Sequence, residues 1–300
     1  MTTGVHAFDE DMAPAGRLAL ALGVGLHPIA LHRFPDGESL PTVAGVGDHV
    51  IIYRSLDRPD GKLMALLLAG DALRRAGAGR LTLVAPYMPY LRQDAVFAPG
   101  QPLSRDVLGA VIGERFDAIV TVDPHLHRTD DLVPVFGGRP VAVLSSAAAF
   151  ADVLGATPDT VVLGPDSESA RWASALATAL AAPFLTLAKT RSGDRLVDLA
   201  LPDPPRFTGR RVVVVDDICS SGATLLLALQ RLREAGAGAV DLAIVHALFD
   251  AQTDGRLRAA GARRIVSTDS CAHATNQVRL APLLARTLAG QATKEGTRTA

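Results

Sequence analysis

The stretch VVVVDDICSSGATL, Val212–Leu225, decides the fold. Its four valines predict a strand that is buried on both faces and that ends in two aspartates. A loop of small residues follows, and then an aliphatic pattern that is typical of a helix. In a parallel α/β sheet, such a strand-to-helix loop lies at the carboxyl edge, where ligands bind. The stretch therefore predicts a ligand site in a parallel α/β sheet.

The loop after the aspartates has the composition of a phosphate site. Unpaired N–H groups and the helix dipole favour an anion at the start of a helix, and a glycine lets the backbone approach it. The predicted cradle consists of Ser220, Ser221, Gly222, Ala223 and Thr224. Asp216 and Asp217 cannot bind that phosphate, but they can accept hydrogen bonds from sugar hydroxyls or hold a metal. A sugar phosphate satisfies both halves of the stretch.

Other structures can share features of this stretch. An ordinary strand, turn and helix with an Asp or Ser N-cap has much the same composition and stays open. The pattern is not a Walker loop, because no G-x-x-x-x-G-K-[ST] occurs in the chain. The stretch also lacks G-x-G-x-x-G, which disfavours a dinucleotide-binding fold.

Short apolar runs alternate with aliphatic helical segments along the chain, which predicts a parallel α/β architecture. The expected strands are Val50–Tyr53, Arg80–Ala85, Ala118–Val122, Thr160–Leu163, Arg211–Val215, Val240–Ala247 and Arg264–Ser267.

One unit occurs twice. MALLLAGDALRRAGAG (64–79) and ATLLLALQRLREAGAG (223–238) are identical at 10 of 16 positions, and each lies between two expected strands. The chance similarity of two Ala/Leu-rich helices is the alternative, but the matching strands favour duplication. We expect two α/β domains, at 1–144 and 145–290, and a disordered tail at 291–300. Before its helix the first copy has RSLDRPDGK in place of DDICSSGAT, so only the second copy is expected to hold the ligand.

Composition limits the classes of function. The chain of 300 residues is 48% hydrophobic and has a net charge of -1, which gives no electrostatic reason to expect a nucleic-acid or membrane partner. Its two cysteines show no disulfide framework, and no signal peptide or membrane-spanning run is visible. We expect a cytoplasmic protein.

The opening stretch resembles the phosphoribosyl diphosphate loop of the type I phosphoribosyltransferase fold. Four further segments resemble one family with that fold, the ribose-phosphate pyrophosphokinases. The resemblance covers roughly residues 31–270 and implies two tandem phosphoribosyltransferase-like domains, each a mainly parallel β-sheet flanked by helices. The first 30 residues do not clearly match the family opening, so their strand and helix are not assigned.

Two of these segments resemble nucleotide-contacting motifs. RFPDGES (33–39) is similar to the family loop F-x-D-G-E, which implies contacts from Phe34, Asp36 and Glu38 to the base. From the residues alone, Pro-Asp-Gly predicts a tight turn. PYMPYLRQD (86–94) is similar to P-Y-x-x-Y-x-R-Q-D, which implies nucleotide contacts from Arg92 and Gln93.

The remaining segments imply a metal and a lid. VDPHLH (122–127) resembles the motif D-L-H, and GPDSES (164–169) holds a further family aspartate; the implied Mg²⁺ ligands are His125, Asp123 and Asp166. His127 has no counterpart and is interpreted as a surface residue. LAKTRSGD (187–194) resembles the catalytic flexible loop, which makes Lys189 and Arg191 the implied catalytic cations.

The resemblance implies a reaction in which ribose 5-phosphate and ATP give 5-phosphoribosyl 1-diphosphate and AMP with Mg²⁺. It also implies a homo-oligomer, either a dimer or dimers built into a larger ring. Two departures bear on this: Ser220 stands where many bacterial members have Asp, and Pro124 replaces an apolar residue before His125. The alternatives are a phosphoribosyltransferase, which has no reason to carry the RQD and FPDGE motifs, and a non-catalytic regulatory paralogue, which should lose the lid cations.

Overall fold

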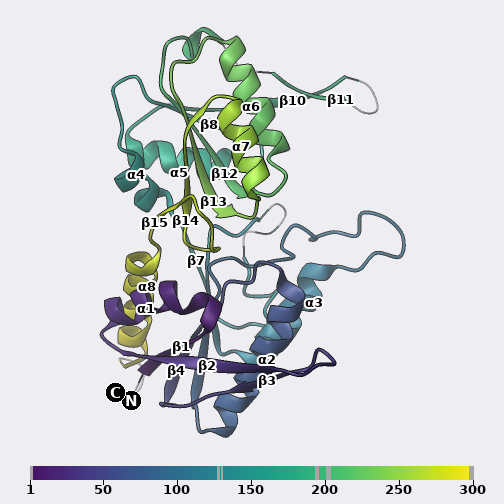
Figure 1. Ribbon diagram of the computed structural model, residues 1–300, viewed down its shortest axis with the longest axis vertical. Helices are drawn as coiled ribbons and strands as arrows, with labels where there is room; N and C mark the ends of the chain where they lie inside the picture. Colours follow the sequence, from purple (N-terminus) through teal and green to yellow (C-terminus); the bar gives the residue numbers. More distant parts are fainter. Residues whose placement is uncertain (1–2, 127–128, 130, 193–195, 201–203, 297–300) are drawn as a thin grey trace. The chain divides into compact units, whose positions relative to one another are not determined.

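The fold is taken from a computed structural model of the chain, which describes residues 3–126, 129, 131–192, 196–200 and 204–296. It consists of two compact α/β units (Figure 1). The first contains Met1–Leu144 and Leu280–Ala300, and the second contains Ser145–Arg279.

The first unit is built on a seven-stranded sheet in the order β3-β2-β1-β4-β5-β6-β7. All neighbouring strands are parallel except β2 and β3, which form an antiparallel hairpin at one edge. The strands are β1 (Thr3–Phe8), β2 (Gly25–Arg33), β3 (Ser39–Thr42), β4 (His49–Tyr53), β5 (Arg80–Val84), β6 (Ala118–Val122) and β7 (Val141–Leu144). The N-terminal strands β1 and β2 lie in the part of the sequence that had not been assigned.

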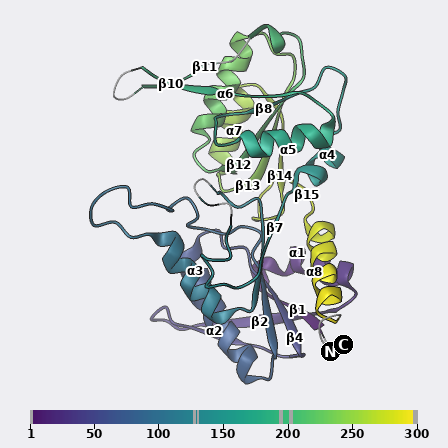
Figure 2. The same cartoon turned by 180° about the vertical axis from the view of Figure 1, so that it is seen from behind.

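Four α-helices flank this sheet. They are α1 (Met12–Leu22), α2 (Pro59–Arg75), α3 (Ser104–Arg115) and α8 (Ala281–Gly296). The second predicted domain ran to residue 290 and was followed by a tail. In the structure the chain instead returns to the first unit at Leu280, and α8 packs beside α1 (Figure 2). The reason is the apolar side of α8, where Leu284 and Leu288 are buried.

The second unit contains a six-stranded, all-parallel sheet in the order β15-β14-β13-β12-β8-β9 and a separate hairpin of β10 and β11. The sheet strands are β8 (Val161–Gly164), β9 (Phe184–Thr186), β12 (Val212–Cys219), β13 (Val240–Ala247), β14 (Ala262–Thr268) and β15 (Asn276–Val278). Helices α6 (Ala223–Glu234) and α7 (Ala251–Ala259) cover one face, and α4 (Ala147–Leu154) and α5 (Ala170–Leu180) cover the other (Figures 1 and 2).

The two sheets repeat one arrangement, which confirms the predicted pair of parallel α/β domains. In the first unit β1 lies between β2 and β4, and in the second unit β8 lies between β9 and β12. Strands β4 and β12 are the ones that precede the repeated helix. The order β2-β1-β4-β5-β6-β7 thus corresponds to β9-β8-β12-β13-β14-β15. Each sheet has its own apolar core, with Phe116 and Phe136 buried in the first and Phe207 in the second.

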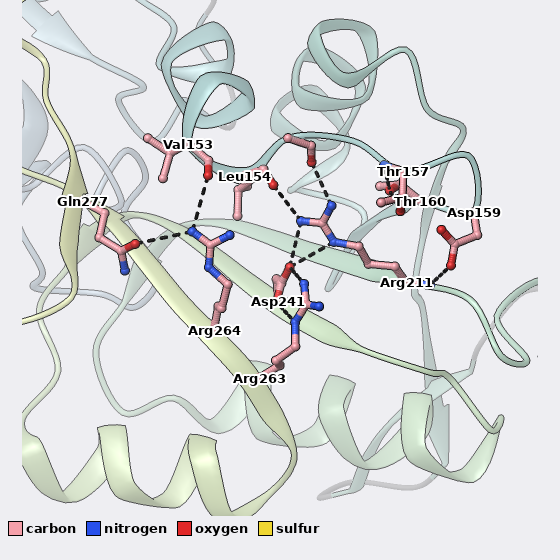
Figure 3. Close-up of polar contacts among 11 residues, drawn as sticks. Val153, Leu154, Thr157, Asp159, Thr160, Arg211, Asp241, Arg263, Arg264 and Gln277 are labelled. Carbon is pink, nitrogen blue, oxygen red and sulfur yellow. Dashed lines mark hydrogen bonds and ion pairs between the residues drawn. The ribbon is translucent and has the colours of Figure 1, made fainter.

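The end of the sheet opposite the carboxyl edge of the second unit is tied by a buried ionic cluster. Asp241 on β13 is fully buried and accepts hydrogen bonds from Arg211 at 2.9 Å and Arg263 at 2.8 Å (Figure 3). Burial opposes the charge on Asp241, but these two guanidinium groups hold its pKa below the usual value. Arg211 also donates to the carbonyls of Leu154 and Gly155, which fastens the end of α4 to the sheet.

Helix α3 packs unusually close to the loop that precedes β7. A Cβ atom on Gly109 would lie 2.1 Å from the carbonyl oxygen of Val135, and one on Gly113 would lie 2.3 Å from that of Phe136. Both glycines are therefore required by contact with backbone and not by their dihedral angles. Arg139, after the loop, donates to the carbonyl of Gly113 at 2.9 Å.

We predict that Gly109→Ala and Gly113→Ala each lower the free energy of unfolding by about 3 kcal/mol, because the added methyl group forces the helix off the loop. Gly290→Ala is the matched control, since this glycine is also helical but has nothing within 4 Å of its Cβ position. The control should gain about 0.5–1 kcal/mol from helix propensity. Urea unfolding measures the change in unfolding free energy for all three variants. Equal changes for Gly109→Ala and Gly290→Ala would contradict the close packing of α3 on the loop.

A buried histidine on β1, His6, packs against a histidine on β2. His6 is fully buried, and within the described chain neither of its ring nitrogens has a hydrogen-bond partner. Its ring stacks on that of His27 at a centroid distance of 4.8 Å. Burial, together with the neighbouring His27, lowers the pKa of His6 from 6.5 to about 4.

We predict that His6 makes the folded chain less stable in acid. Between pH 6.5 and 4 the unfolded chain binds this proton and the folded chain does not, so stability is lost as the pH falls. Above pH 6.5 His6 is neutral in both states, and the free energy of unfolding should be about 3 kcal/mol higher than it is below pH 4. The measurement is the difference in unfolding free energy between the wild type and His6→Leu at several pH values. Curves that stay parallel from pH 8 to pH 4 would contradict the assignment.

Candidate functional site

The second sheet opens at its carboxyl edge between β8 and β12. Strand β12 pairs with β8 only through Val212–Val214, whereas its pairing with β13 continues to Cys219. The chain leaves β8 towards β9 on one side, and β12 lies on the other, so this is the point where the strand order reverses. Ligands of open α/β sheets bind in the crevice at such a point.

The sequence expectation that β12 stops before its aspartates is wrong. The strand runs on to Cys219, and both aspartates belong to it because β13 pairs with this segment. Side chains alternate along a strand, so Asp216 and Asp217 leave it towards opposite faces. Asp216 is half-buried, and Asp217 is buried, with its carboxylate accepting from the N–H of Ile218 at 2.8 Å.

The loop from β12 into α6 has the form that the phosphate-cradle interpretation requires. Gly222 is the N-cap residue of α6 with φ of +73°, and no side chain caps the helix. The Oγ of Ser221 lies 3.4 Å from the N–H of Ala223, at the long limit of a hydrogen bond. An ordinary Asp or Ser N-cap is therefore not what begins this helix. Ser220 and Ser221 are exposed, and Thr224 lies in the first turn.

Asp166 lies in the loop that follows β8, on the other side of the opening. Its Oδ1 accepts hydrogen bonds from the N–H groups of Glu168 and Ser169, both at 3.0 Å. The Ser169 hydroxyl donates to the Asp166 carbonyl at 2.6 Å, which closes a compact turn. Carboxylates thus lie in the last part of β12 and in the loop after β8.

The corresponding point of the first sheet, between β1 and β4, is filled by an ion-pair cluster. Arg54, directly after β4, is fully buried and lies 2.8 Å from Asp11 and 2.7 Å from Glu10. Its guanidinium group also lies 4.3 Å from the ring centroid of Phe8. Lys62 of α2 lies 3.3 Å from Glu10. Opposite charges meet at this point of the first unit, whereas the matching segments of the second unit carry the carboxylates Asp166, Asp216 and Asp217.

The predicted turn at Phe34–Glu38 is confirmed as a tight turn joining β2 and β3. Phe34 and Glu38 pair through an N–H to carbonyl hydrogen bond of 2.9 Å, and Gly37 has φ of +95°. Phe34 is 39% exposed and lies edge-on to His32, while Asp36 and Glu38 are exposed. The turn therefore presents an aromatic face and two acids at the edge of the first sheet.

Arg92 and Gln93 lie in the long loop after β5. Both are exposed, and Gln93 is held by the Ser104 hydroxyl at 2.5 Å at the start of α3. Strands β2 and β5 are separated by β1 and β4 in the sheet, so three strand spacings, roughly 14 Å, lie between them. Strand order thus keeps the Phe34 turn and the Arg92 loop at separate places on the same carboxyl edge.

Asp123 and His125 follow β6, next to β5. Asp123 is buried and has φ of +39°, a strained conformation for a non-glycine residue, and its N–H donates to the carbonyl of Leu144 at 2.8 Å. Pro124 is buried, and His125 is half-buried. His127 lies outside the described residues. Asp123 and His125 belong to the first unit, and Asp166 belongs to the second.

Lys189 and Arg191 lie two residues apart in β10 (Ala188–Ser192). This strand pairs with β11 (Leu196–Ala200), with Lys189 opposite Leu199 and Arg191 opposite Val197. The hairpin stands apart from the six-stranded sheet in both views (Figures 1 and 2). The tip of the predicted flexible loop, residues 193–195, lies outside the part of the chain that the structure describes.

Comparisons with known proteins agree with this arrangement. The family model for the N-terminal domain of ribose phosphate pyrophosphokinase matches residues 7–113, and that for the phosphoribosyl transferase domain matches residues 143–282. A ribose-phosphate pyrophosphokinase of Methanopyrus kandleri is 34% identical over 94% of this chain and 97% of its own. One from Halobacterium salinarum is 34% identical over 91% of this chain and 96% of its own. The chain belongs to the ribose-phosphate pyrophosphokinase family.

A solved structure of a family member supports the fold. The phosphoribosylpyrophosphate synthetase from Mycobacterium smegmatis is 27% identical, covers 99% of this chain and 100% of its own, and gives a TM-score of 0.83. The family model begins at residue 7, so the first 30 residues match the family better than their motifs indicated.

No group of three or more His, Cys, Asp or Glu side chains that could hold a metal ion occurs among the described residues of this family member. Likewise, no helix in the described ranges is long and apolar enough to cross a membrane. The predicted carboxylates Asp123 and Asp166 nevertheless provide the oxygen donors that Mg²⁺ prefers.

Sequence reasoning missed the cluster around Arg54. The available signal was the arginine directly after the first copy's strand, where the second copy has an aspartate. Its acidic partners Glu10 and Asp11 are 43 or more residues away, in a region with no assigned strand, so the pairing could not be read from the motif.

We predict that Arg54→Ala lowers the free energy of unfolding by about 3–5 kcal/mol at pH 8, because it leaves a buried carboxylate without its cation. Alkaline conditions matter, since burial raises the pKa of Asp11 to about 6 despite the adjacent Arg54. Arg75→Ala is the control, because its ion pair with Asp71 is largely exposed and should cost under about 0.5 kcal/mol. Chemical denaturation compares the two; similar losses would contradict the buried ion pair.

Proposed function

We propose that this chain is a ribose-phosphate diphosphokinase that converts ribose 5-phosphate and ATP into 5-phosphoribosyl 1-diphosphate and AMP. In this reaction the anomeric hydroxyl of the sugar attacks the β-phosphorus of the nucleotide. A diphosphoryl group is transferred, and AMP leaves with the electrons of the broken P–O bond. The product supplies nucleotide biosynthesis. Membership of the family supports the reaction class.

The observation that carries this proposal is the passage from β12 into α6 in the second unit, where pairing with β8 has ended and no side chain caps the helix. The loop of Ser220–Thr224 would receive the 5-phosphate, because it enters α6 without a capping side chain and leaves the first N–H groups of the helix available. Asp216 and Asp217 would accept hydrogen bonds from the ribose or bind its metal. The first unit offers no equivalent place, since Arg54 and Asp11 fill it.

The nucleotide would bind at the carboxyl edge of the first sheet. Arg92 can make bidentate contacts to phosphate oxygens, and Gln93 is already oriented by Ser104. Phe34, Asp36 and Glu38 would contact a base. Because the sheet order separates them from Arg92, we propose that this turn serves the nucleotide site of a second subunit.

Asp123 and His125 of the first unit, and Asp166 of the second, are the residues that we propose as Mg²⁺ ligands. Mg²⁺ keeps several waters and is often bound through one or two carboxylates and substrate phosphates. When bound, it would neutralise charge on phosphate oxygens. Lys189 and Arg191 would stabilise the negative charge that develops on the transferred group.

A homo-oligomer in the cytoplasm completes the proposal. Helices α2 and α3 expose apolar side chains at neighbouring turns, which favours burial against another subunit: Met64, Leu68, Val107 and Val111. Both substrates are phosphorylated metabolites that do not cross membranes unaided, which favours the cytoplasm.

The test is to mix the purified chain with ribose 5-phosphate, ATP and Mg²⁺ and to follow AMP by chromatography. We expect AMP formation that depends on ribose 5-phosphate. A phosphoribosyltransferase would instead form no AMP from ATP, and in a separate assay it would consume 5-phosphoribosyl 1-diphosphate together with a nucleobase. Substrate binding without either reaction, at several phosphate concentrations, would identify a regulatory paralogue.

We predict that Lys189→Ala lowers kcat at least about 100-fold and changes the Kd for ribose 5-phosphate little, because the charge acts on the transition state. Lys189→Arg, which keeps the charge, should retain more activity. Steady-state kinetics and calorimetry measure the two quantities. A similar loss in both would place Lys189 in the sugar site.

A further inference from the structure

The phosphate loop of the second unit rests on the connection from β13 to α7. The N–H of Leu248, directly after β13, donates to the carbonyl of Cys219 at 2.8 Å, which fixes the last residue of β12. Three residues later along the loop, Gly222 meets the first turn of α7. Both ends of the segment 219–222 are therefore held by one neighbouring connection.

The contact at Gly222 leaves no room for a side chain. A Cβ atom there would lie 2.8 Å from Cγ2 of Thr253, 3.8 Å from Cδ2 of Leu257 and 3.9 Å from Sγ of Cys219. Thr253, Leu257 and Cys219 are all buried. The Thr253 methyl group thus forms part of the floor on which the backbone of Gly222 lies.

Thr253 is itself held in one orientation. Its N–H donates to Oδ1 of Asp250, the N-cap residue of α7, at 2.8 Å. Hydrogen bonds from the backbone and the side chain of Thr253 lower the pKa of Asp250. With its hydroxyl group directed to Asp250, the branched side chain turns its methyl group towards Gly222.

The first copy of the duplicated unit provides an internal comparison. When the two copies are aligned by sequence, Gly222, the N-cap residue of α6, corresponds to Leu63, which is partly buried and lies within α2. The copy whose crevice is closed by ion pairs has no glycine at this place.

We propose that Thr253 is a positioning residue for the sugar phosphate. Its methyl group holds Gly222, so that the N–H groups of the loop stay directed at the phosphate, although Thr253 does not touch the substrate itself. This inference rests on the proposed function, since it takes ribose 5-phosphate as the ligand of the loop.

Two variants separate the methyl group from the hydroxyl group. Thr253→Ser removes the methyl contact and keeps the hydrogen bond to Asp250, whereas Thr253→Val keeps the methyl group. We expect Thr253→Ser to raise the Kd and KM for ribose 5-phosphate about fivefold, with the KM for ATP unchanged. Thr253→Val should stay within about twofold of the wild type. Thr287→Ser, on α8 of the first unit, is the matched control and should change neither constant.

Calorimetry measures sugar-phosphate binding independently of turnover, and thermal unfolding checks folding. A selective loss of ribose 5-phosphate affinity in Thr253→Ser supports the inference. Unchanged affinity in Thr253→Ser, or equal losses for both substrates together with a lowered Tm, would overturn it and leave the proposed reaction standing. If the wild type binds no ribose 5-phosphate, both the inference and the proposed function fail.

Discussion

The site of this protein depends on the unequal pairing of β12. Its hydrogen bonds to β8 end at Val214, while those to β13 continue to Cys219. The second half of the strand is therefore supported from one side and borders an opening on the other. That opening brings Asp216, Asp166 and the start of α6 to one edge of the sheet, where a parallel arrangement places its ligands.

Each of the two duplicated units has such an edge, and the two edges differ in their charged residues. In the first unit, a buried arginine pairs with acids from the neighbouring loop, so the crevice is filled by the chain's own charges. In the second unit, Asp216 stands at the place that Arg54 has in the first, and the loop after β8 carries Asp166. The charges at the two edges therefore differ in sign, and so does the composition of the loop before the repeated helix.

The opposite end of the second sheet shows how stability is kept away from the site. Asp241 accepts from two arginines, and Arg211 reaches the carbonyls at the end of α4. This cluster ties the amino ends of three strands together. At the carboxyl edge, hydrogen bonds of neutral side chains such as His246, Thr268 and Ser270 fasten β13 and β14 instead.

Sequence by itself determined the parallel α/β class, the duplication, the central strands and the position of the small-residue loop before α6. These are local properties: the valine run, the repeated helix and the motifs each lie within about 16 residues. Strands β1 and β2 escaped prediction because His6, His27 and Pro28 interrupt their apolar patterns, and pairing with neighbouring strands overrides that weak signal. Tertiary structure alone decided the extension of β12, the return of α8 to the first unit, the closure by Arg54 and the support of Gly222 by Thr253. Each of these joins residues that are 30 or more positions apart or depends on which strands lie side by side, and no short-range pattern records such pairings.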